Sequence, residues 1–410
     1  MKEKRRPSPP LWRKVLKLLL ALMVLAALGA CLYLSPLIIF IGEGLIHSPS
    51  VQRVFDSLRH IGHVPVLIPK TSEHIAFVCL VNADWSWRRN RLYTIQPDGS
   101  RLRDITIDDT KVHYNLDWSP DGEWLAFTLN YRNYAALMDE WSLDDYDEIH
   151  RIRYDGTESR RLTYSDSYES APRWTHDGQH VLYHEWWAGS GLLHRVSAQA
   201  SGLRALTDFE VAEFDISPDR QKLAVVARIH EGEPQPVYVM NPDGSETEHL
   251  LTTNVNVSEI QWSPDNKRIL YHAYNGLPTI YDIVAGREEP APLIRIRGAR
   301  WSPDNRWIAI TGGLDRYKDD YEWIDIHGTS DEKLTNSLHL YNIVTGELKQ
   351  LVSSFAGHLS SASWSPDSQW LAFSRGSPNA QVYKIRVNGS GLQQLTDLDC
   401  GAYGVVWSPM

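Results

Sequence analysis

Cysteine and basic charge are scarce in this chain of 410 residues, and each scarcity excludes a class of protein. Three cysteines are too few for a disulfide-rich scaffold, and their spacing does not form a zinc knuckle. The formal net charge of −10 argues against nucleic acid as a partner, because backbone phosphates need a basic face. Hydrophobic residues nevertheless make up 42% of the chain, with 16 Trp and 19 Tyr. This composition excludes a disordered chain and favours a large folded core.

The charge that is present is divided unevenly along the chain. Residues 1–17 carry seven of the 41 basic residues and one of the 51 acidic residues, so the remainder has a formal net charge of −16. Residues 18–42 then carry no formal charge, and a helix of this length spans the roughly 30 Å of hydrocarbon in a bilayer. Under the positive-inside rule, we predict four segments. They are a basic cytoplasmic tail at 1–17, a transmembrane anchor at 18–42, a juxtamembrane linker at 43–70 and an extracytoplasmic body at 71–410.

Two other interpretations of the amino-terminal segment remain open. Leu28-Gly29-Ala30-Cys31 resembles the lipobox of bacterial lipoproteins, in which the cysteine (Cys31) carries the lipid. A cleaved secretory signal is the other, although its apolar region is typically only about 7–15 residues long. All three interpretations place the body on the same side of the cell membrane.

A repeated motif divides the body into similar units. Trp-Ser-Pro-Asp, or a close variant, precedes an apolar run such as Trp124-Leu-Ala-Phe127. Each unit is predicted to form four short strands separated by turns. One unit begins with Ile216 in place of tryptophan. The other units begin with tryptophans to which we assign a structural role: Trp118, Trp174, Trp262, Trp301, Trp364 and Trp407.

The residue types of the motif suit a tight turn between two strands. Proline fixes φ, and the aspartate side chain can bond to a backbone amide two residues on. The position after the aspartate is Gly or Asn in most units, and these residues tolerate a positive φ. Arg220 and Ser368 suit this position less well. The large tryptophan ring is expected to wedge between neighbouring sheets.

The two ends of the body complement each other. A four-stranded unit of about 48 residues cannot bury both of its faces alone, and radial packing against two neighbours solves that problem. The apolar run at 74–80 has no motif before it, whereas the last motif, at Trp407, has no strands after it. We therefore predict that these two segments pair. The fold class is then all-β, a seven-bladed β-propeller of four-stranded blades preceded by one transmembrane helix.

The Trp-Ser-Pro-Asp-Gly motif with its apolar run resembles the WD40-like (PD40) repeat of TolB and related bacterial propellers. The resemblance covers nearly all of residues 71–410 and implies the same propeller fold. TolB-like proteins also carry an amino-terminal α/β domain and usually six blades, whereas residues 43–70 are too few for that domain. The resemblance therefore implies fold and does not transfer function.

Motifs that carry catalysis are missing from the sequence. Propeller enzymes of the prolyl oligopeptidase type resemble this chain in their propeller but add a hydrolase domain bearing Gly-x-Ser-x-Gly. That pentapeptide is absent, no residues follow Met410 to form such a domain, and His-Glu-x-x-His and phosphate-binding loops are absent as well. We therefore expect no enzyme, no catalytic residue, no metal and no cofactor.

Two long insertions between strands are the candidate binding surface. They lie at 130–148 and 312–335 and are rich in acids and aromatic rings, which could receive a basic protein segment or stack on a sugar. The predicted surface comprises Tyr134, Asp139, Glu140, Trp141, Asp144, Asp145, Asp147, Asp315, Asp319, Asp320, Glu322, Trp323 and Asp325. Calcium is a subsidiary hypothesis because clustered carboxylates suit hard cations, although the strict calcium-loop motif is absent.

Two cysteines lie in the split unit, since Cys79 ends its first strand and Cys400 precedes its last. An extracytoplasmic location permits a disulfide between them, and two buried thiols are the alternative.

Together these features predict a non-catalytic, membrane-anchored propeller that binds a protein partner at the cell envelope. Carbohydrate or another small ligand is the alternative partner, and an enzyme with its site in the central funnel is the third hypothesis.

Overall fold

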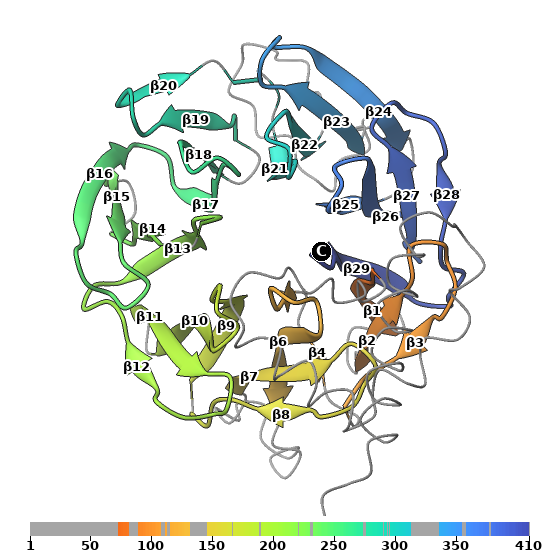
Figure 1. Cartoon of the computed structure of the whole chain (residues 1–410), viewed down its shortest axis with the longest axis horizontal. Helices are drawn as coiled ribbons and strands as arrows, with labels where there is room; N and C mark the ends of the chain where they lie inside the picture. Colours follow the sequence, from red (N-terminus) through yellow and green to blue (C-terminus); the bar gives the residue numbers. More distant parts are fainter. Residues whose placement is uncertain are drawn as a thin grey trace, which may run out of the picture. The chain divides into compact units, whose positions relative to one another are not determined.

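The computed structural model consists of antiparallel β-sheets arranged around a ring (Figure 1). It describes residues 73–409 except 82–88, 108–110, 113–114, 132–145, 166, 188–189, 220, 230–232, 274–275, 290, 293, 295, 313–335, 355–357 and 377–378. These residues all belong to one compact unit, Lys70–Met410. The predicted all-β class is confirmed. Within the described residues there is no helix with the length and hydropathy that membrane crossing requires, and the predicted anchor at 18–42 lies outside them.

Four sheets of the ring have four strands each, in chain order. The first contains β13 (Val211–Ile216), β14 (Leu223–Ala227), β15 (Gln235–Met240) and β16 (Glu248–Thr253). The second contains β17 (Val257–Trp262), β18 (Arg268–Ala273), β19 (Thr279–Asp282) and β20 (Arg287–Glu289). The third contains β21 (Ile296–Trp301), β22 (Trp307–Gly312), β23 (Asn336–Asn342) and β24 (Leu348–Ser354). The fourth contains β25 (His358–Trp364), β26 (Trp370–Gly376), β27 (Gln381–Arg386) and β28 (Gln393–Gln394).

A nine-stranded sheet precedes them and consists of two groups of strands. One group contains β4 (Lys111–Val112), β5 (Asp117–Trp118), β6 (Trp124–Tyr131), β7 (Tyr146–Arg153) and β8 (Arg160–Arg161). The other contains β9 (Tyr168–Trp174), β10 (His180–Trp187), β11 (Ser190–Ser197) and β12 (Arg204–Ala205). A single parallel pairing, Asp147 opposite Tyr168, joins β7 to β9.

The remaining sheet combines strands from the two ends of the body. Its strand order is β29 (Gly401–Trp407), β1 (Ile75–Val81), β2 (Arg89–Ile95) and β3 (Arg103–Asp104). Ile75 pairs with Trp407, so the segments that were predicted to meet lie side by side. A disulfide joins Cys79 to Cys400, whose Cα atoms are 5.6 Å apart, whereas the sequence left open both a disulfide and two buried thiols.

The repeated motif forms a turn that its serine and aspartate hold together. In the first complete motif, the Ser119 hydroxyl donates to Asp121 Oδ1 and accepts from the Trp124 backbone N–H. Asp121 Oδ1 also accepts from the Glu123 N–H, two residues on. The next position has the expected positive φ, 70° at Gly122, and Ser368 adopts a φ of 59° in the last turn of this kind. The serine hydroxyl therefore holds the turn together with the aspartate.

The hydrophobic core lies between neighbouring sheets. One cluster joins Val226 and Val237 of one sheet to Ile260, Trp262 and Ile269 of the next. The six motif tryptophans are all at most 7% exposed, as expected of rings that wedge between sheets. Each sheet therefore buries its faces only by having neighbours.

Hydrogen bonds tie the strands nearest the ring centre to one another. The side chain just before one motif accepts a hydrogen bond from the backbone N–H of the tryptophan in the next motif along the chain. The pairs are Trp174 N to Asp117 Oδ2 at 2.7 Å, Trp262 N to Asp215 Oδ2 at 2.9 Å and Trp407 N to Ser363 Oγ at 2.9 Å. These bonds fix the spacing of neighbouring sheets where the ring is narrowest.

The disulfide gives a direct test of how much the junction of the two chain ends contributes to stability. Cys79 and Cys400 are separated by 321 residues, so the chain-entropy model predicts that the bond contributes up to about 5 kcal/mol. We expect the Cys79→Ala/Cys400→Ala variant to unfold at a lower urea concentration than wild type. Its free energy of unfolding should be lower by up to that amount. Reduced wild-type protein should match the variant, and equal stability of oxidised wild type and variant would contradict the prediction.

Candidate functional site

Charged side chains gather on the strands nearest the ring centre. Side chains alternate between the two faces of a strand, so the residues one and three positions before each motif tryptophan share a face. On β9, β13, β17 and β21 these positions place charge next to buried apolar residues. We call this group the inner cluster, and its members are Arg173, Glu213, Asp215, Glu259 and Arg300.

Glu259 is held in the inner cluster by an ion pair and two hydrogen bonds. Its carboxylate forms an ion pair with Arg300 and accepts a hydrogen bond at 2.9 Å from Nε2 of His272, which is buried. It also accepts from the Ala299 backbone N–H at 3.3 Å, so it links β17 to β21. The Glu259 side chain is 21% exposed and that of Arg300 is 46% exposed. The pair is therefore supported by protein on one side and open to solvent on the other.

Two members of opposite charge lack an ion-pair partner among the described residues. Arg173 donates to the Pro172 carbonyl at 3.0 Å but meets no carboxylate within ion-pair distance. Glu213 likewise has no hydrogen bond or ion pair, although the charges of Arg173 and Glu259 act on it. Both side chains are only partly exposed. An acidic and a basic side chain thus remain available to a ligand at one place.

The protonation states of the two glutamates are driven apart. Burial would raise the pKa of Glu259, but the charge of Arg300 and the hydrogen bond from His272 outweigh it and lower the pKa to about 2. Burial raises the pKa of Glu213 to about 7, with Arg173 opposing the rise and Glu259 adding to it. Glu259 is therefore an anion at neutral pH, while Glu213 exchanges a proton there. A titrating carboxyl beside a fixed carboxylate is the arrangement that acid–base chemistry uses.

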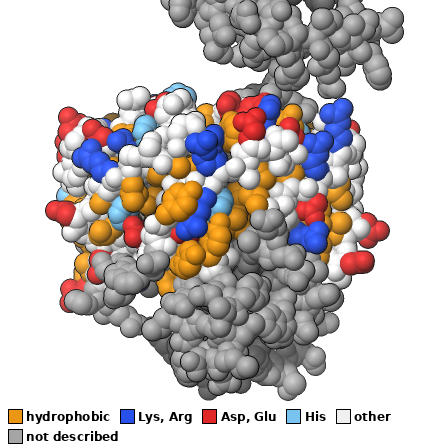
Figure 2. Space-filling view, turned by 90° about the horizontal axis from the view of Figure 1, so that it is seen from below, with side chains coloured by type: hydrophobic (Ala, Val, Ile, Leu, Met, Phe, Trp, Pro, Cys, Tyr) orange, Lys and Arg blue, Asp and Glu red, His pale blue; other side chains and the backbone are white. Residues whose placement is uncertain are grey.

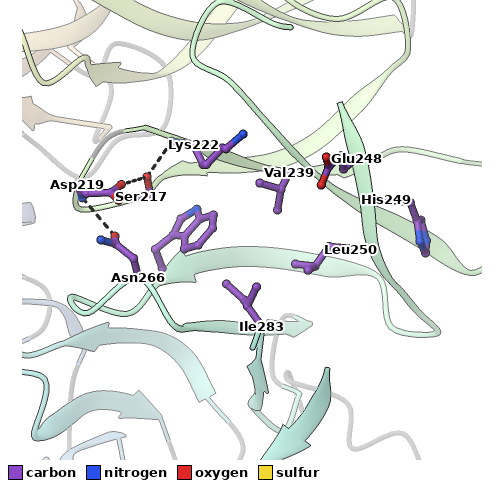
Figure 3. Close-up of a pocket in the computed structure, with 10 residues that line it drawn as sticks. Ser217, Asp219, Lys222, Val239, Glu248, His249, Leu250, Asn266 and Ile283 are labelled. Carbon is purple, nitrogen blue, oxygen red and sulfur yellow. Dashed lines mark hydrogen bonds between the residues drawn. The ribbon is translucent and has the colours of Figure 1, made fainter. Parts of the chain in front are cut away.

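A shallow pocket lies elsewhere, between the sheet of β13–β16 and the sheet of β17–β20 (Figure 3). Its volume is about 250 Å³, and its lining includes Ser217, Asp219, Lys222 and Asn266. These polar groups already bond to one another, since Ser217 donates to Asp219 and the Asp219 N–H donates to Asn266. The pocket is therefore part of the motif turns, and we place the candidate site at the inner cluster.

Most of the surface predicted from the sequence lies outside the described residues. This applies to Tyr134, Asp139, Glu140, Trp141, Asp144, Asp145, Asp315, Asp319, Asp320, Glu322, Trp323 and Asp325. On the side of the ring seen in Figure 2, apolar side chains lie among basic and acidic ones without a field of one sign. No group of three His, Cys, Asp or Glu residues that could hold a metal ion occurs in the described part of the chain.

Asp147 is the exception, and its placement differs from the prediction. It is 8% exposed and accepts a hydrogen bond at 2.7 Å from Asn130 Nδ2 on the adjacent strand. The carboxylate lies below the surface because β7 begins at Tyr146, so Asp147 belongs to the sheet and not to the insertion. It anchors the base of the insertion.

The inner cluster was missed because the sequence was searched for long loops and known motifs. A usable signal was present, since a charged residue lies one or three positions before the first residue of the motif in five consecutive units, from Asp117 to Arg300. Aligning the repeats on the tryptophan and asking which offsets carry charge would have found it.

Comparison with known proteins begins with a repeat model. The WD domain, G-beta repeat matches residues 349–377, from β24 to β26. An uncharacterized protein of Agrobacterium fabrum, Atu1656, is 26% identical over 41% of this chain. An uncharacterized peptidase of Bacillus subtilis, YuxL, is 28% identical over 38% of this chain. The matched regions cover 59% and 20% of the lengths of these two relatives.

Solved structures similar to this one extend over most of the chain. The crystal structure of a puromycin hydrolase variant complexed with PGG has a TM-score of 0.55 and 15% identity, and covers 80% of this chain and 53% of that chain. TolB from Acinetobacter baumannii has a TM-score of 0.49 and 12% identity over 82% of this chain and 83% of that chain. Together with the repeat match, the puromycin hydrolase likeness supports a WD40-like β-propeller fold.

These comparisons contradict the prediction that the chain is not an enzyme. One relative is named a peptidase, and a hydrolase structure shares the fold. The prediction failed because it rested on short motifs of known active sites. A site assembled from single residues on several strands leaves no such motif.

The opposite protonation of the two glutamates predicts opposite effects of removing their charge. Glu259 stabilises the fold above its ordinary pKa and loses this contribution as the pH falls toward 2. Glu213 favours the fold when protonated and loses that contribution as the pH rises through about 7. We expect Glu259→Gln to lower the free energy of unfolding at pH 7 by about 3 kcal/mol. Glu213→Gln should gain stability over wild type, by about 1.4 kcal/mol for each pH unit between about 5 and 7.

Urea unfolding of the full chain at several pH values measures both effects. Because the two variants make the same chemical change on neighbouring strands, each is the control for the other. Effects of the same sign would contradict the assigned protonation states.

Proposed function

We propose that this chain is a propeller that binds a peptide segment at the inner cluster. The observation that carries the proposal is the pair of oppositely charged groups, Arg173 and Glu213, that have no ion-pair partner among the described residues. A peptide with free ends presents an ammonium group and a carboxylate, and its backbone adds donors and acceptors between them. Charged groups with fixed positions recognise such a ligand by charge-assisted hydrogen bonds.

The architecture that we propose is seven blades closed by the pairing of β29 with β1. The five four-stranded sheets supply five blades, and the two groups of the nine-stranded sheet supply two more. In the proposal, residues 18–42 anchor the chain, residues 43–70 link the anchor to the propeller, and the propeller lies at the extracytoplasmic side of the cell membrane. A partner at the cell envelope is then the natural source of the peptide segment, and the two insertions would add contacts around it.

A peptide ligand is consistent with the comparisons. WD40-type propellers generally serve as protein-interaction modules, and one relative of this chain is named a peptidase. Peptide recognition is the step that a receptor and a peptidase share. The titrating carboxyl of Glu213 beside the ionised Glu259 gives the inner cluster a proton donor and acceptor at neutral pH.

The proposal predicts that binding depends on both free charges. The probe is a library of tripeptides with free termini, screened by thermal shift against the full chain in detergent and then titrated calorimetrically. Loss of a charge-assisted hydrogen bond costs about 1.5–3 kcal/mol, so Glu213→Gln and Arg173→Gln should each weaken binding by about 10-fold to 100-fold.

Glu246→Gln is the matched control because this carboxylate is 68% exposed on an outer turn, where its loss should leave binding unchanged. Equal binding by all variants would place the ligand elsewhere. Binding to a glycan array without a response to peptides would favour the carbohydrate alternative.

A further inference from the structure

Three glutamates outside the inner cluster are linked by hydroxyl groups where β7 meets β9. Glu148 lies on β7, Glu169 on β9 and Glu185 on β10. The first two are almost inaccessible to solvent, at 0% and 1% exposure. The bridging hydroxyls come from the segment between β8 and β9. We call the whole group the carboxyl chain, and its order is Glu148, Thr163, Glu169, Ser165, Ser167 and Glu185.

Every neighbouring pair in the carboxyl chain is within hydrogen-bond distance. Thr163 Oγ1 lies 2.7 Å from Glu148 Oε2 and is also hydrogen-bonded to Glu169 Oε2. Ser165 Oγ lies 2.9 Å from Glu169 Oε1 and 2.7 Å from Ser167 Oγ. Ser167 Oγ lies 3.0 Å from Glu185 Oε1. The carboxyl chain thus has five contacts between oxygen atoms.

The number of protons does not match the number of contacts. Each hydroxyl group has one proton to donate, and an ionised carboxylate has none. Three hydroxyls therefore fill at most three of the five contacts when all three glutamates are ionised, and one added proton fills a fourth. The mismatch is sharpest at Thr163, which also accepts from the Ile149 backbone N–H at 2.9 Å and touches two carboxyl groups. Its single proton satisfies one of them, so the other contact needs a proton from the carboxyl itself.

The last sheet shows what the same position looks like without this mismatch. Thr396 Oγ1 accepts from the Val382 N–H at 2.9 Å, as Thr163 does from Ile149. It then donates to a neutral amide, Gln381 Oε1, at 2.8 Å. One donor meets one acceptor there. At Thr396 the number of donors thus equals the number of acceptors, whereas at Thr163 in the carboxyl chain it does not.

Charged and aromatic side chains surround the Glu148 end of the carboxyl chain. Arg161 forms an ion pair with Glu148 and is flanked by Tyr131, Tyr146 and Tyr164, whose rings lie 4.4–5.8 Å from its guanidinium carbon. Near the other end, Nδ1 of His194 lies 3.2 Å from Glu185 Oε2. The titratable and charged groups that face the chain from β6, β7, β8, β10, β11 and the segment after β8 are Tyr131, Tyr146, His150, Arg161, Tyr164, Tyr183 and His194.

The electrostatic environment agrees with the proton count. Burial raises the pKa of Glu169 to about 8, and although the bond from Thr163 opposes this, the charge of Glu148 adds to it. Burial and the positive charge of Arg161 lower the pKa of His150 to about 3. The His150 ring is therefore neutral at pH 7 and adds no positive charge beside the carboxyl chain. Burial also raises the pKa of the Tyr183 hydroxyl, which has no hydrogen-bond partner among the described residues.

We propose that the carboxyl chain holds one excess proton at neutral pH, centred on Glu169. This proton stabilises the contact between β7 and β9, so the stability of that contact depends on pH. With the proton present, Glu169 donates to Thr163 and Thr163 donates to the ionised Glu148. When the proton leaves to solvent, two buried carboxylates share one hydroxyl and repel each other. The weakened contact lies beside the parallel pairing of Asp147 and Tyr168, which joins the two strand groups at the base of the first insertion.

The test compares wild-type full chain with Glu169→Gln, which mimics the protonated carboxyl and does not titrate. Because the folded state holds a proton that the unfolded state releases above its ordinary pKa, wild type loses stability as the pH rises toward about 8. The unfolding equilibrium constant of wild type should rise about tenfold relative to the variant for each pH unit between about 5.5 and 7.5. Glu246→Gln should follow wild type. A ratio that does not change with pH would overturn the proposal.

An infrared measurement keeps the proposal testable if Glu169→Gln does not fold. Exposed carboxyls are ionised by pH 7, and the Glu213→Gln background removes the other glutamate with a strongly raised pKa in the described residues. The C=O stretch of a protonated carboxyl should remain at pH 7 in this background and disappear as the pH passes about 8. Absence of the band at pH 7 would overturn the proposal.

Discussion

The ring depends on the contact between each motif and the next. A single four-stranded sheet has two apolar faces, and the motif tryptophan covers part of one face only because the neighbouring sheet lies against it. The hydrogen bonds from Trp174, Trp262 and Trp407 to side chains of the preceding motif set the separation at the ring centre. Nearest-neighbour contacts of this kind make the ring a sum of similar junctions, in which a local change in chemistry alters one junction at a time.

The fold was accessible from the sequence because its physical causes recur. Trp-Ser-Pro-Asp appears often enough that a strand, a turn and a wedge can be assigned without knowledge of the three-dimensional structure, and the unmatched run at 74–80 indicates where the chain ends meet. The role of Ser119, which closes the turn by donating to Asp121 and accepting from Trp124, was not predicted. A serine hydroxyl has no periodic signature, since its effect depends on which backbone amide the turn brings to it.

The candidate site was less accessible, for a related reason. Arg173, Glu213 and Glu259 are spread over nearly ninety residues, and each is an ordinary charged residue in its own strand. Their significance comes from the packing of neighbouring sheets, which brings four such strands to one place and leaves some charges without an ion-pair partner among the described residues. The wrong prediction that the chain is not an enzyme has the same origin. The predicted surface was chosen by loop length, which indicates where sequence variation is tolerated. The inner strands, by contrast, carry charged side chains that form no ion pair among the described residues.

The disulfide between Cys79 and Cys400 also orders events in the life of the protein. Among the described strands, its sheet contains β1, the first to be synthesised, and β29, the last. While the rest of the body is being made, β1 has to wait with one edge unpaired, and exposed edges of this kind are where chains associate wrongly. Among the described sheets, the first to begin is therefore the last to be completed, and the disulfide covalently joins the two segments that complete it.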